Sequence, residues 1–343
     1  MVYGFWKNLP RPIIGLAPMD GVTDAAFRFI VAKYGKPAVM MTEFTSVEGI
    51  RAGAERLLDD FLYSPIERPV VAQLFGADPA AFFIGAVAAS ALGFDGLDIN
   101  MGCPAKNVTE RGAGAALIAD PERAKEIVRQ TRAGTQAWSN GISLKEAGLH
   151  DGIANLITER RAAYGLTERT ELPVSIKTRL GVSTITITDW IPHLLEVEPV
   201  NITIHGRTLK QLYTGEANWE AIADGARLVK EAGFATVLGN GDIKSLEDAH
   251  ERSRIYGTDG ALIGRSSFGN PWVFTPEVLP MTDLKAVALE HARVLQDYFG
   301  GRGFIRIRKH LMDYFKGDAE AKALRLQLMR VTNLEEVEEL LKP

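Results

Sequence analysis

Residues 70–104, VVAQLFGADPAAFFIGAVAASALGFDGLDINMGCP, decide the fold. An apolar run, Val70–Leu74, precedes a helical stretch, Pro79–Leu92, and a second apolar run, Gly96–Asn100, follows it. Near-continuous apolar runs are typical of parallel strands that are buried on both faces. Strands that alternate with helices in this way predict an α/β protein with a parallel sheet.

The same alternation recurs along most of the chain, with turns rich in Gly, Pro, Asn and Asp after each apolar run. The predicted strands are Ile13–Ala17, Ala38–Thr42, Val70–Leu74, Gly96–Asn100, Val174–Lys177, Ile202–His205, Thr236–Gly239 and Ala261–Gly264. The predicted helices are Asp24–Tyr34, Pro79–Leu92, Pro121–Arg132, Asp189–Glu196, Trp219–Ala232 and Leu246–Tyr256. Eight strands over about 250 residues predict a (β/α)8 TIM barrel, and an open doubly wound sheet is the alternative.

Two further segments do not belong to a minimal barrel. Residues 134–172 are far longer than the usual helix-to-strand link of about 2–6 residues, and Leu144–Tyr164 has a helical pattern. We expect an ordered insertion on the N-terminal face of the barrel, away from an active site. After Pro280, Asp283–Phe299 and Asp318–Lys342 are helical in period, and the basic residues between them are Arg302, Arg306, Arg308, Lys309 and His310. We therefore expect a barrel in residues 1–280 and a small helical domain in residues 281–343.

Composition excludes several classes of protein. The chain has 343 residues, of which 46% are hydrophobic and 24% charged, and this composition argues against global disorder. Because no apolar stretch reaches the roughly 18 residues of a membrane span, we expect a cytoplasmic protein without membrane contact. A single cysteine, Cys103, excludes an internal disulfide and Cys-rich metal sites, and no His or carboxylate–His spacing predicts a bound metal. The net charge of −4 leaves only a local basic face for nucleic acid.

The ends of the last two predicted strands indicate a phosphate site. In TIM barrels the loops after strands seven and eight often bind phosphate. Asn240-Gly241-Asp242 offers backbone N–H groups that can approach an anion, and Gly264-Arg265 adds a cation. The alternative is that these glycines serve tight turns only.

Polar residues at other strand ends point to a redox cofactor. Lys177 ends a buried strand, His205 ends the next strand, and Gln73 lies near the end of the third. Two cationic donors would suit a reduced flavin, which carries charge near N1 and the C2 carbonyl. A hydrogen-bonded core histidine is the alternative for His205.

Cys103 lies between Gly102 and Pro104, in a turn that follows a predicted strand. A neutral thiol there can donate a proton to a developing carbanion. No base stands near it in the sequence, so a proton donor is favoured over a nucleophile. A buried small hydrophobic residue is the alternative.

These motifs resemble those of the tRNA-dihydrouridine synthases. The resemblance covers Pro12 to about Phe274 and, more weakly, Ile307 to Leu341. Its most specific element is residues 98–106, DINMGCPAK, followed by residues 112–115, GAGA. The other motifs, in order, are residues 17–19, 73–76, 177–181, 205–208, 213–215, 240–243, 264–265, 308–310, 314 and 316–317.

The resemblance implies an FMN-dependent oxidoreductase that reduces uridine to 5,6-dihydrouridine in tRNA, with NADPH as the electron donor. Cys103 would be the general acid, and Asn100 would help to position the base. The implied contacts to the flavin ring are Ala17, Pro18 and Met19. The implied contacts to its polar edge are Gln73, Lys177 and His205, and those to its ribityl phosphate are Asn240, Gly241, Asp242, Gly264 and Arg265.

The target base must leave its stack to reach a barrel mouth, and phosphate contacts must supply the energy that holds the RNA. The candidate basic residues are Lys106, Arg111, Arg179, Arg207, Lys210, Arg308, Lys309 and Lys316. The insertion at residues 134–172, Asn107 and Glu110 depart from the family pattern. We expect a monomer.

Two other functions compete with this one. The first is an FMN barrel of the dihydroorotate dehydrogenase type that acts on a free pyrimidine, and the basic helical C-terminus argues against it. The second is a flavin-free RNA-binding barrel, and Lys177, Gln73 and the phosphate loops argue against it.

Overall fold

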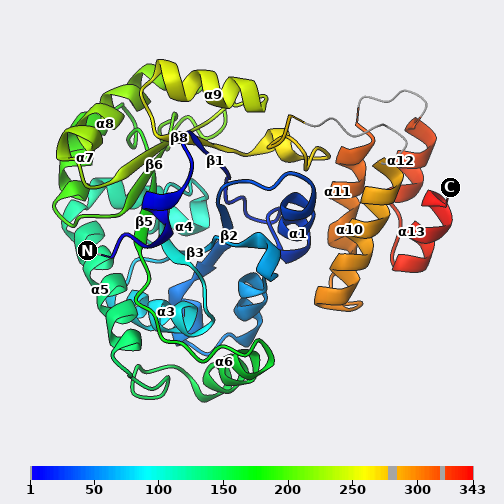
Figure 1. Ribbon diagram of the computed structural model, residues 1–343, viewed down its shortest axis with the longest axis horizontal. Helices are drawn as coiled ribbons and strands as arrows, with labels where there is room; N and C mark the ends of the chain where they lie inside the picture. The colour runs from blue at the N-terminus through cyan, green and yellow to red at the C-terminus, as the bar shows by residue number, and fades with distance from the viewer. Residues whose placement is uncertain (1, 277–283, 317–320, 343) are drawn as a thin grey trace.

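In the computed structural model, which describes residues 2–276, 284–316 and 321–342, eight parallel strands close into a barrel (Figure 1). The strands are β1 (Ile13–Leu16), β2 (Met40–Ser46), β3 (Val70–Phe75), β4 (Gly96–Met101), β5 (Val174–Arg179), β6 (Asn201–His205), β7 (Thr236–Asn240) and β8 (Gly260–Ile263). Each strand pairs with its sequence neighbours, and β1 also pairs with β8, with Ile13 opposite Gly260. The predicted TIM barrel is confirmed, and the open sheet is excluded.

The predicted strand boundaries hold to within a few residues, with β2 as the largest difference. This strand was expected at Ala38–Thr42 but runs from Met40 to Ser46. Its pairing with β3 shifts register between Met41 and Phe44, which marks a bulge. A bulge inserts an extra residue and bends the strand, so the alternation of side chains does not mark the strand end in the sequence.

Helices surround the barrel, and their caps fix where they begin. They are α1 (Ala25–Tyr34), α3 (Pro79–Ala91), α5 (Pro121–Ser139), α7 (Ile187–Leu195), α8 (Trp219–Ala232) and α9 (Leu246–Ile255). Asp24 accepts a hydrogen bond from the N–H of Phe27 at 2.9 Å, and Ser245 accepts one from Asp248 at 3.2 Å. Short segments complete the ring: α2 (Val47–Arg51), α4 (Lys106–Thr109), η1 (Gly4–Asn8), η2 (Glu55–Phe61), η3 (Pro65–Glu67), η4 (Gly114–Ala119) and η5 (Arg265–Ser267).

The insertion begins later than expected, because α5 continues to Ser139 instead of ending at Arg132. Its one long helix is α6 (Asp151–Ala163), shorter than the predicted Leu144–Tyr164. Arg161 of α6 donates to the carbonyl of Ala91, at the end of α3. Because α3 leads into the N-terminal end of β4, this contact places the end of α6 on the side of the barrel expected for the insertion.

The C-terminal region is a group of helices that packs against α1 (Figure 1). They are α10 (Leu284–Phe299), η7 (Phe304–Arg306), α11 (Ile307–Tyr314), α12 (Lys322–Leu328) and α13 (Leu334–Leu341). Ala26 and Ile30 of α1 share a buried apolar cluster with Val287 of α10 and Leu311 of α11. The helical domain is therefore fixed to the barrel by an apolar interface.

The predicted helix at Asp318–Lys342 is two helices in the described part of the chain. Asn333 accepts a hydrogen bond from the N–H of Glu336 at 2.9 Å and so starts α13. Residues 281–283 and 317–320 of the predicted helical domain lie outside the described residues. Among the helices that the structure describes, none is long and apolar enough to cross a membrane.

Candidate active site

A cavity of about 1170 Å³ opens at the C-terminal ends of the barrel strands. Its wall comes from residues 17–22 after β1, Phe44 of β2, residues 100–106 at β4, Lys177 and Arg179 of β5, and residues that follow β6, β7 and β8. Active sites of TIM barrels lie on this face. Of the residues predicted to bind a cofactor, all but Gln73 line the cavity, and Ala17, Pro18 and Met19 do so together.

The turn that carries Cys103 is fixed by Asn100. The side-chain Oδ1 of Asn100 accepts hydrogen bonds from the backbone N–H of Gly102 at 3.0 Å and of Cys103 at 2.8 Å. The carbonyl of Cys103 accepts from the N–H of Ala115 at 3.1 Å. Asn100 itself lines the cavity, but its oxygen is engaged by this turn. These contacts hold the backbone of the turn that carries Cys103.

The thiol of Cys103 is protonated at neutral pH. Only 9% of Cys103 is exposed, and Val108, Ala113, Phe44 and Phe75 pack around it in an apolar cluster. Burial raises the pKa of this thiol, because an apolar setting disfavours the thiolate. A protonated thiol on a cavity wall suits an acid better than a nucleophile, which reacts as the thiolate.

Lys177 is a half-buried cation without a hydrogen-bond partner among the described residues. It sits on β5 and lines the cavity. Burial lowers its pKa to about 8, Arg179 lowers it as well, and the carboxylate of Asp98 acts in the opposite direction. A buried ammonium needs a partner, so this side chain is available to an electron-rich ligand in the cavity.

His205 is neutral at neutral pH. Burial lowers its pKa well below the usual value, and the cations Lys177 and Arg179 lower it further. Nη1 of Arg207 lies 3.4 Å from Nε2 of His205. Because a guanidinium only donates, this contact assigns the lone pair to Nε2 and the hydrogen to Nδ1. His205 therefore presents a neutral imidazole to the cavity, not the second cation that the sequence suggested.

A chain of ion pairs crosses the loops after β6, β7 and β8. Asp242 accepts from Nη2 of Arg207 at 2.7 Å, from Nη2 of Arg265 at 2.6 Å and from the N–H of Ala217 at 2.8 Å. These partners outweigh the effect of its partial burial and lower the pKa of Asp242. Asp242 thereby holds both arginines at the cavity, while Arg265 remains largely exposed and can reach a ligand.

Gly241 lies where the backbone angle favours glycine and where there is no room for a side chain. Its φ is +129°, and a Cβ there would lie 2.6 Å from Cβ of Ala217 and 3.2 Å from Cδ2 of His205. Trp219 donates from Nε1 to the carbonyl of Gly241 at 3.0 Å, so the turn is held from outside. Because Gly241 has no side chain, its backbone can come close to an anion, and Arg265 adds a positive charge nearby. We call this glycine–arginine arrangement the cradle, and it is typical of phosphate-binding loops.

Gln73 and Asn240, two residues predicted to contact the cofactor, form hydrogen bonds with other parts of the protein. Gln73 is fully buried, donates to Asp98 at 2.7 Å and accepts from Asn100 at 2.9 Å. Asn240 lines the cavity but donates to the carbonyl of Leu262 at 2.8 Å. Gln73 thus supports Asn100 from outside the cavity lining, and its direct contact with the flavin stays a prediction.

Arg179 and Arg207, which the sequence predicts to contact RNA, are buried and line the cavity. Each is only 2% exposed. Arg179 donates to the carbonyls of Gly102, Thr208 and Leu212 at 2.7, 3.0 and 3.0 Å. Both guanidiniums therefore hold the loops of the cavity rim, because most of their hydrogen bonds end on backbone carbonyls and on Asp242, with His205 as a further neighbour of Arg207.

Three other residues predicted to contact RNA differ in their exposure and in their hydrogen bonds within the protein. Lys106 is exposed at the rim, 3.6 Å from Glu110. Lys309 is also exposed, and its Nζ lies next to Gly21 in the loop after β1. Arg308 is half-buried and donates to the carbonyls of Val331 and Arg330 at 2.8 and 3.2 Å, so it supports the helical domain.

Sequence reasoning missed a group of buried residues outside the cavity. Asp24, His291 and His310 come together where the helical domain meets α1. His310 was counted among basic residues, but it is buried and burial lowers its pKa well below the usual value. The spacing in the sequence gave no signal, since contact between the two domains creates the group.

The fold and the cavity define a TIM-barrel protein with an active-site cavity at its strand ends and a helical C-terminal domain. Residues 15–143 and 150–343 match the protein family described as "Dihydrouridine synthase (Dus)". Similar proteins include one from Staphylococcus epidermidis described as a "Probable tRNA-dihydrouridine synthase", 34% identical over 99% of this chain and 96% of its own length. Another, from Bacillus subtilis, is described as "Probable tRNA-dihydrouridine synthase 2" and is 32% identical over 99% and 96%.

Among solved structures, DHODH from Eimeria tenella has a TM-score of 0.48 and 12% identity, covering 83% of this chain and 82% of that one. A mandelate oxidase mutant has a TM-score of 0.42 and 14% identity, covering 95% and 77%. The family match and the relatives span nearly the whole chain. The chain belongs to the dihydrouridine synthase family.

Proposed function

We propose that this protein is a tRNA-dihydrouridine synthase that reduces the C5–C6 bond of uridine in tRNA, with FMN as cofactor, NADPH as electron donor and Cys103 as proton donor. The observation that carries the proposal is the pairing of two features in one cavity. A protonated thiol stands on the wall after β4, and a glycine-arginine cradle stands on the wall after β7 and β8. Family membership supports the same reaction.

The cavity suits FMN in its size and in its polar groups. Drug-sized ligands occupy cavities of about 300–1,000 Å³, and this cavity of about 1170 Å³ leaves room for a cofactor and a base together. Gly241, Gly264 and Arg265 would hold the phosphate. Lys177 would face the electron-rich edge of the ring system, because it lines the cavity and its ammonium has no hydrogen-bond partner among the described residues. Ala17, Pro18 and Met19 would pack against the ring.

The chemistry is divided between the cofactor and this chain. The bound FMN would supply hydride chemistry at C6 of the uracil ring. Cys103 holds a proton on Sγ and gives it to C5, where negative charge develops. Asn100 keeps that thiol in place through its two backbone hydrogen bonds. A neutral His205 can donate from Nδ1, and the apolar groups around the thiol keep it protonated by disfavouring the thiolate.

Exposed cations around the cavity mouth support RNA as the substrate. Lys106 on the rim and Lys309 beside the loop after β1 are exposed and can contact phosphates. The helical domain presents Lys309 from α11, and a free pyrimidine would need no such platform. Since every group named here comes from one chain, we propose a monomer. We also propose a cytoplasmic location, which a tRNA substrate supports.

The test uses purified full-length protein, with tRNA that lacks dihydrouridine. The protein should release FMN on denaturation and, with NADPH, should add two hydrogens to a uridine of the tRNA, as measured by mass spectrometry of the digested nucleosides. Free uridine and free orotate serve as control substrates and should remain unreduced. Reduction of a free pyrimidine, with tRNA left unchanged, would overturn the assignment.

A further inference from the structure

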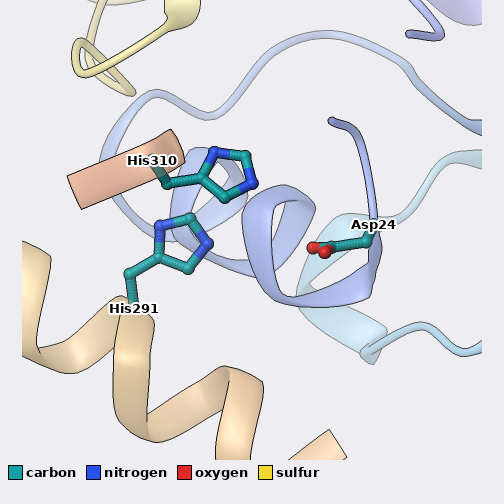
Figure 2. Close-up of side chains that lie close together, drawn as sticks. All are labelled: Asp24, His291 and His310. Atoms are coloured by element: carbon teal, nitrogen blue, oxygen red, sulfur yellow. The ribbon is translucent and has the colours of Figure 1, made fainter. Parts of the chain in front are cut away.

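A cluster of three metal-ligand side chains joins the helical domain to the barrel. Asp24 caps the start of α1, His291 lies on α10, and His310 lies on α11. One ligand atom from each residue lies within 4.8 Å of the other two. In Figure 2 the two imidazoles lie side by side, and the carboxylate of Asp24 points toward them.

The cluster contains two buried nitrogen atoms without partners. Asp24 is 4% exposed, His291 is fully buried, and His310 is 3% exposed. In the part of the chain that the structure describes, Nε2 of His291 and Nε2 of His310 have no hydrogen-bond partner. Buried polar atoms are rarely left unsatisfied, so each orphaned nitrogen calls for a ligand.

The second ring nitrogen of His291 has a neighbour in the helical domain. Nδ1 of His291 lies 3.1 Å from the hydroxyl of Tyr314, which can accept a hydrogen bond from it or donate one to it. In the tautomer with the hydrogen on Nδ1, the orphaned Nε2 carries the lone pair that a metal ion needs. Metal-binding histidines usually have their second nitrogen held in this way.

We propose that Asp24, His291 and His310 form a binding site for a divalent transition-metal ion of the zinc type, which clamps the helical domain to the barrel. Two imidazole nitrogens and one carboxylate oxygen are a donor set that Zn²⁺ prefers, whereas Mg²⁺ and Ca²⁺ prefer oxygen ligands. A small ligand such as water completes four-coordination. Zinc bonds of about 2.0–2.1 Å bring ligand atoms closer together than 4.8 Å, so the side chains close around the ion.

The charges around the site can balance the ion. Burial raises the pKa of Asp24, while the N–H of Phe27 and the cations Lys309, Arg28 and Arg306 lower it. These three cations oppose a second positive charge. The carboxyl of Glu43 also interacts electrostatically with Asp24 and has the opposite sign to these cations when it is ionised.

This site was not expected from the sequence, which predicted no metal. Neither histidine has a partner at the spacing of a familiar zinc motif, and Asp24 lies in the barrel. The site lies outside the flavin cavity, so its test is independent of the proposed reaction.

The test uses the full-length protein after dialysis against a chelator, with ZnCl₂ or CoCl₂ as the probe. The wild-type protein should bind one Zn²⁺ per chain by elemental analysis, and added Zn²⁺ should raise Tm by a few degrees. Bound Co²⁺ should give the visible absorption bands of a site with nitrogen and oxygen ligands. A wild-type protein that neither retains Zn²⁺ nor gives these bands overturns the proposal.

Variants separate this site from adventitious binding. Asp24→Asn retains a side-chain oxygen for the cap of α1, and His291→Gln retains a polar side chain. Both should lose the bound Zn²⁺ and the rise in Tm. His250→Ala removes an exposed histidine of α9 and should bind Zn²⁺ as the wild type does. Equal Zn²⁺ content in the wild type and in folded Asp24→Asn and His291→Gln would contradict the proposal, and the Co²⁺ spectrum decides the matter if either variant does not fold.

Discussion

Two walls of the cavity differ in whether their polar groups are paired within the protein. On the wall after β6, β7 and β8, Asp242 pairs with Arg207 and Arg265, so charge is balanced within the protein. On the wall of β4 and β5, Lys177 has no hydrogen-bond partner among the described residues, and Cys103 keeps its proton among apolar side chains. Both walls carry predicted contacts to the cofactor, and the second also carries the predicted proton donor. Damage to the first wall should cost cofactor binding, and loss of Cys103 from the second should cost turnover.

Loss of the thiol should give the largest effect. Cys103→Ala should lower the turnover of tRNA by about 10²–10⁴-fold, because general acid catalysis contributes that much. The flavin content and the rate of flavin reduction by NADPH should stay at wild-type values, since the first wall is intact. Steady-state kinetics and the flavin absorption spectrum measure these quantities. Wild-type turnover in this variant would remove Cys103 from the mechanism.

Adding a side chain at position 241 should disturb the loop after β7 and weaken FMN binding. Gly241→Ala places a Cβ 2.6 Å from that of Ala217, at a φ of +129° that an alanine rarely adopts. An overpacking cost of about 1–3 kcal/mol would weaken FMN binding by roughly tenfold to a hundredfold. Gly301→Ala is the matched control, because no atom lies within 4 Å of its Cβ position. Equal FMN dissociation constants for the two variants would contradict the cradle.

The pH dependence of FMN binding sharpens the comparison through Lys177. Burial lowers the pKa of this ammonium to about 8, so the group is charged below that pH and loses its charge above it. An electron-rich flavin edge prefers the charged form. The affinity of the apoprotein for FMN should therefore fall as pH rises through about 8, by at most about tenfold per pH unit. Fluorescence titration measures it, and Lys177→Met should abolish this dependence.

Substitutions of Arg308 and Lys309, neighbours on α11, should have the smallest effects of the four predictions. One should affect the stability of the helical domain and the other RNA binding. Lys309→Ala should raise the KM for tRNA a few-fold and reduce the slope of log affinity against log salt by about 0.7–0.9. Arg308→Ala should leave that slope unchanged and lower the free energy of unfolding by about 1 kcal/mol, because two backbone carbonyls lose a donor. The opposite pattern would reverse the roles of the two residues.

The barrel could be predicted because its strands are continuous apolar runs that end in polar turns. Helix α8 begins at Trp219 and ends at Ala232, as the sequence predicted, because its pattern is strongly amphipathic. The bulge in β2 and the break before Asn333 could not be predicted, since both depend on local hydrogen bonding that period alone does not report.

The site was predictable to the extent that strand ends meet on one face. This rule brought Cys103, Lys177, His205 and Arg265 to one cavity. The same rule could not predict which polar groups form hydrogen bonds within the protein and which stay available to a ligand. Gln73, Arg179 and Arg207 lie at strand ends too, but their hydrogen bonds are satisfied by neighbouring side chains and loops. The contact of Asp24 with the two histidines depends on docking of the helical domain, which no local pattern records.

A single-turnover experiment tests the central claim, that one cavity holds the flavin beside the reduced uridine. The flavin of the full-length protein is reduced with NADPH, oxygen and excess NADPH are removed, and tRNA lacking dihydrouridine is added by rapid mixing. The account predicts that the flavin is reoxidised with one dihydrouridine formed per flavin, and that fully modified tRNA leaves it reduced. Flavin that stays reduced with unmodified tRNA would contradict the account.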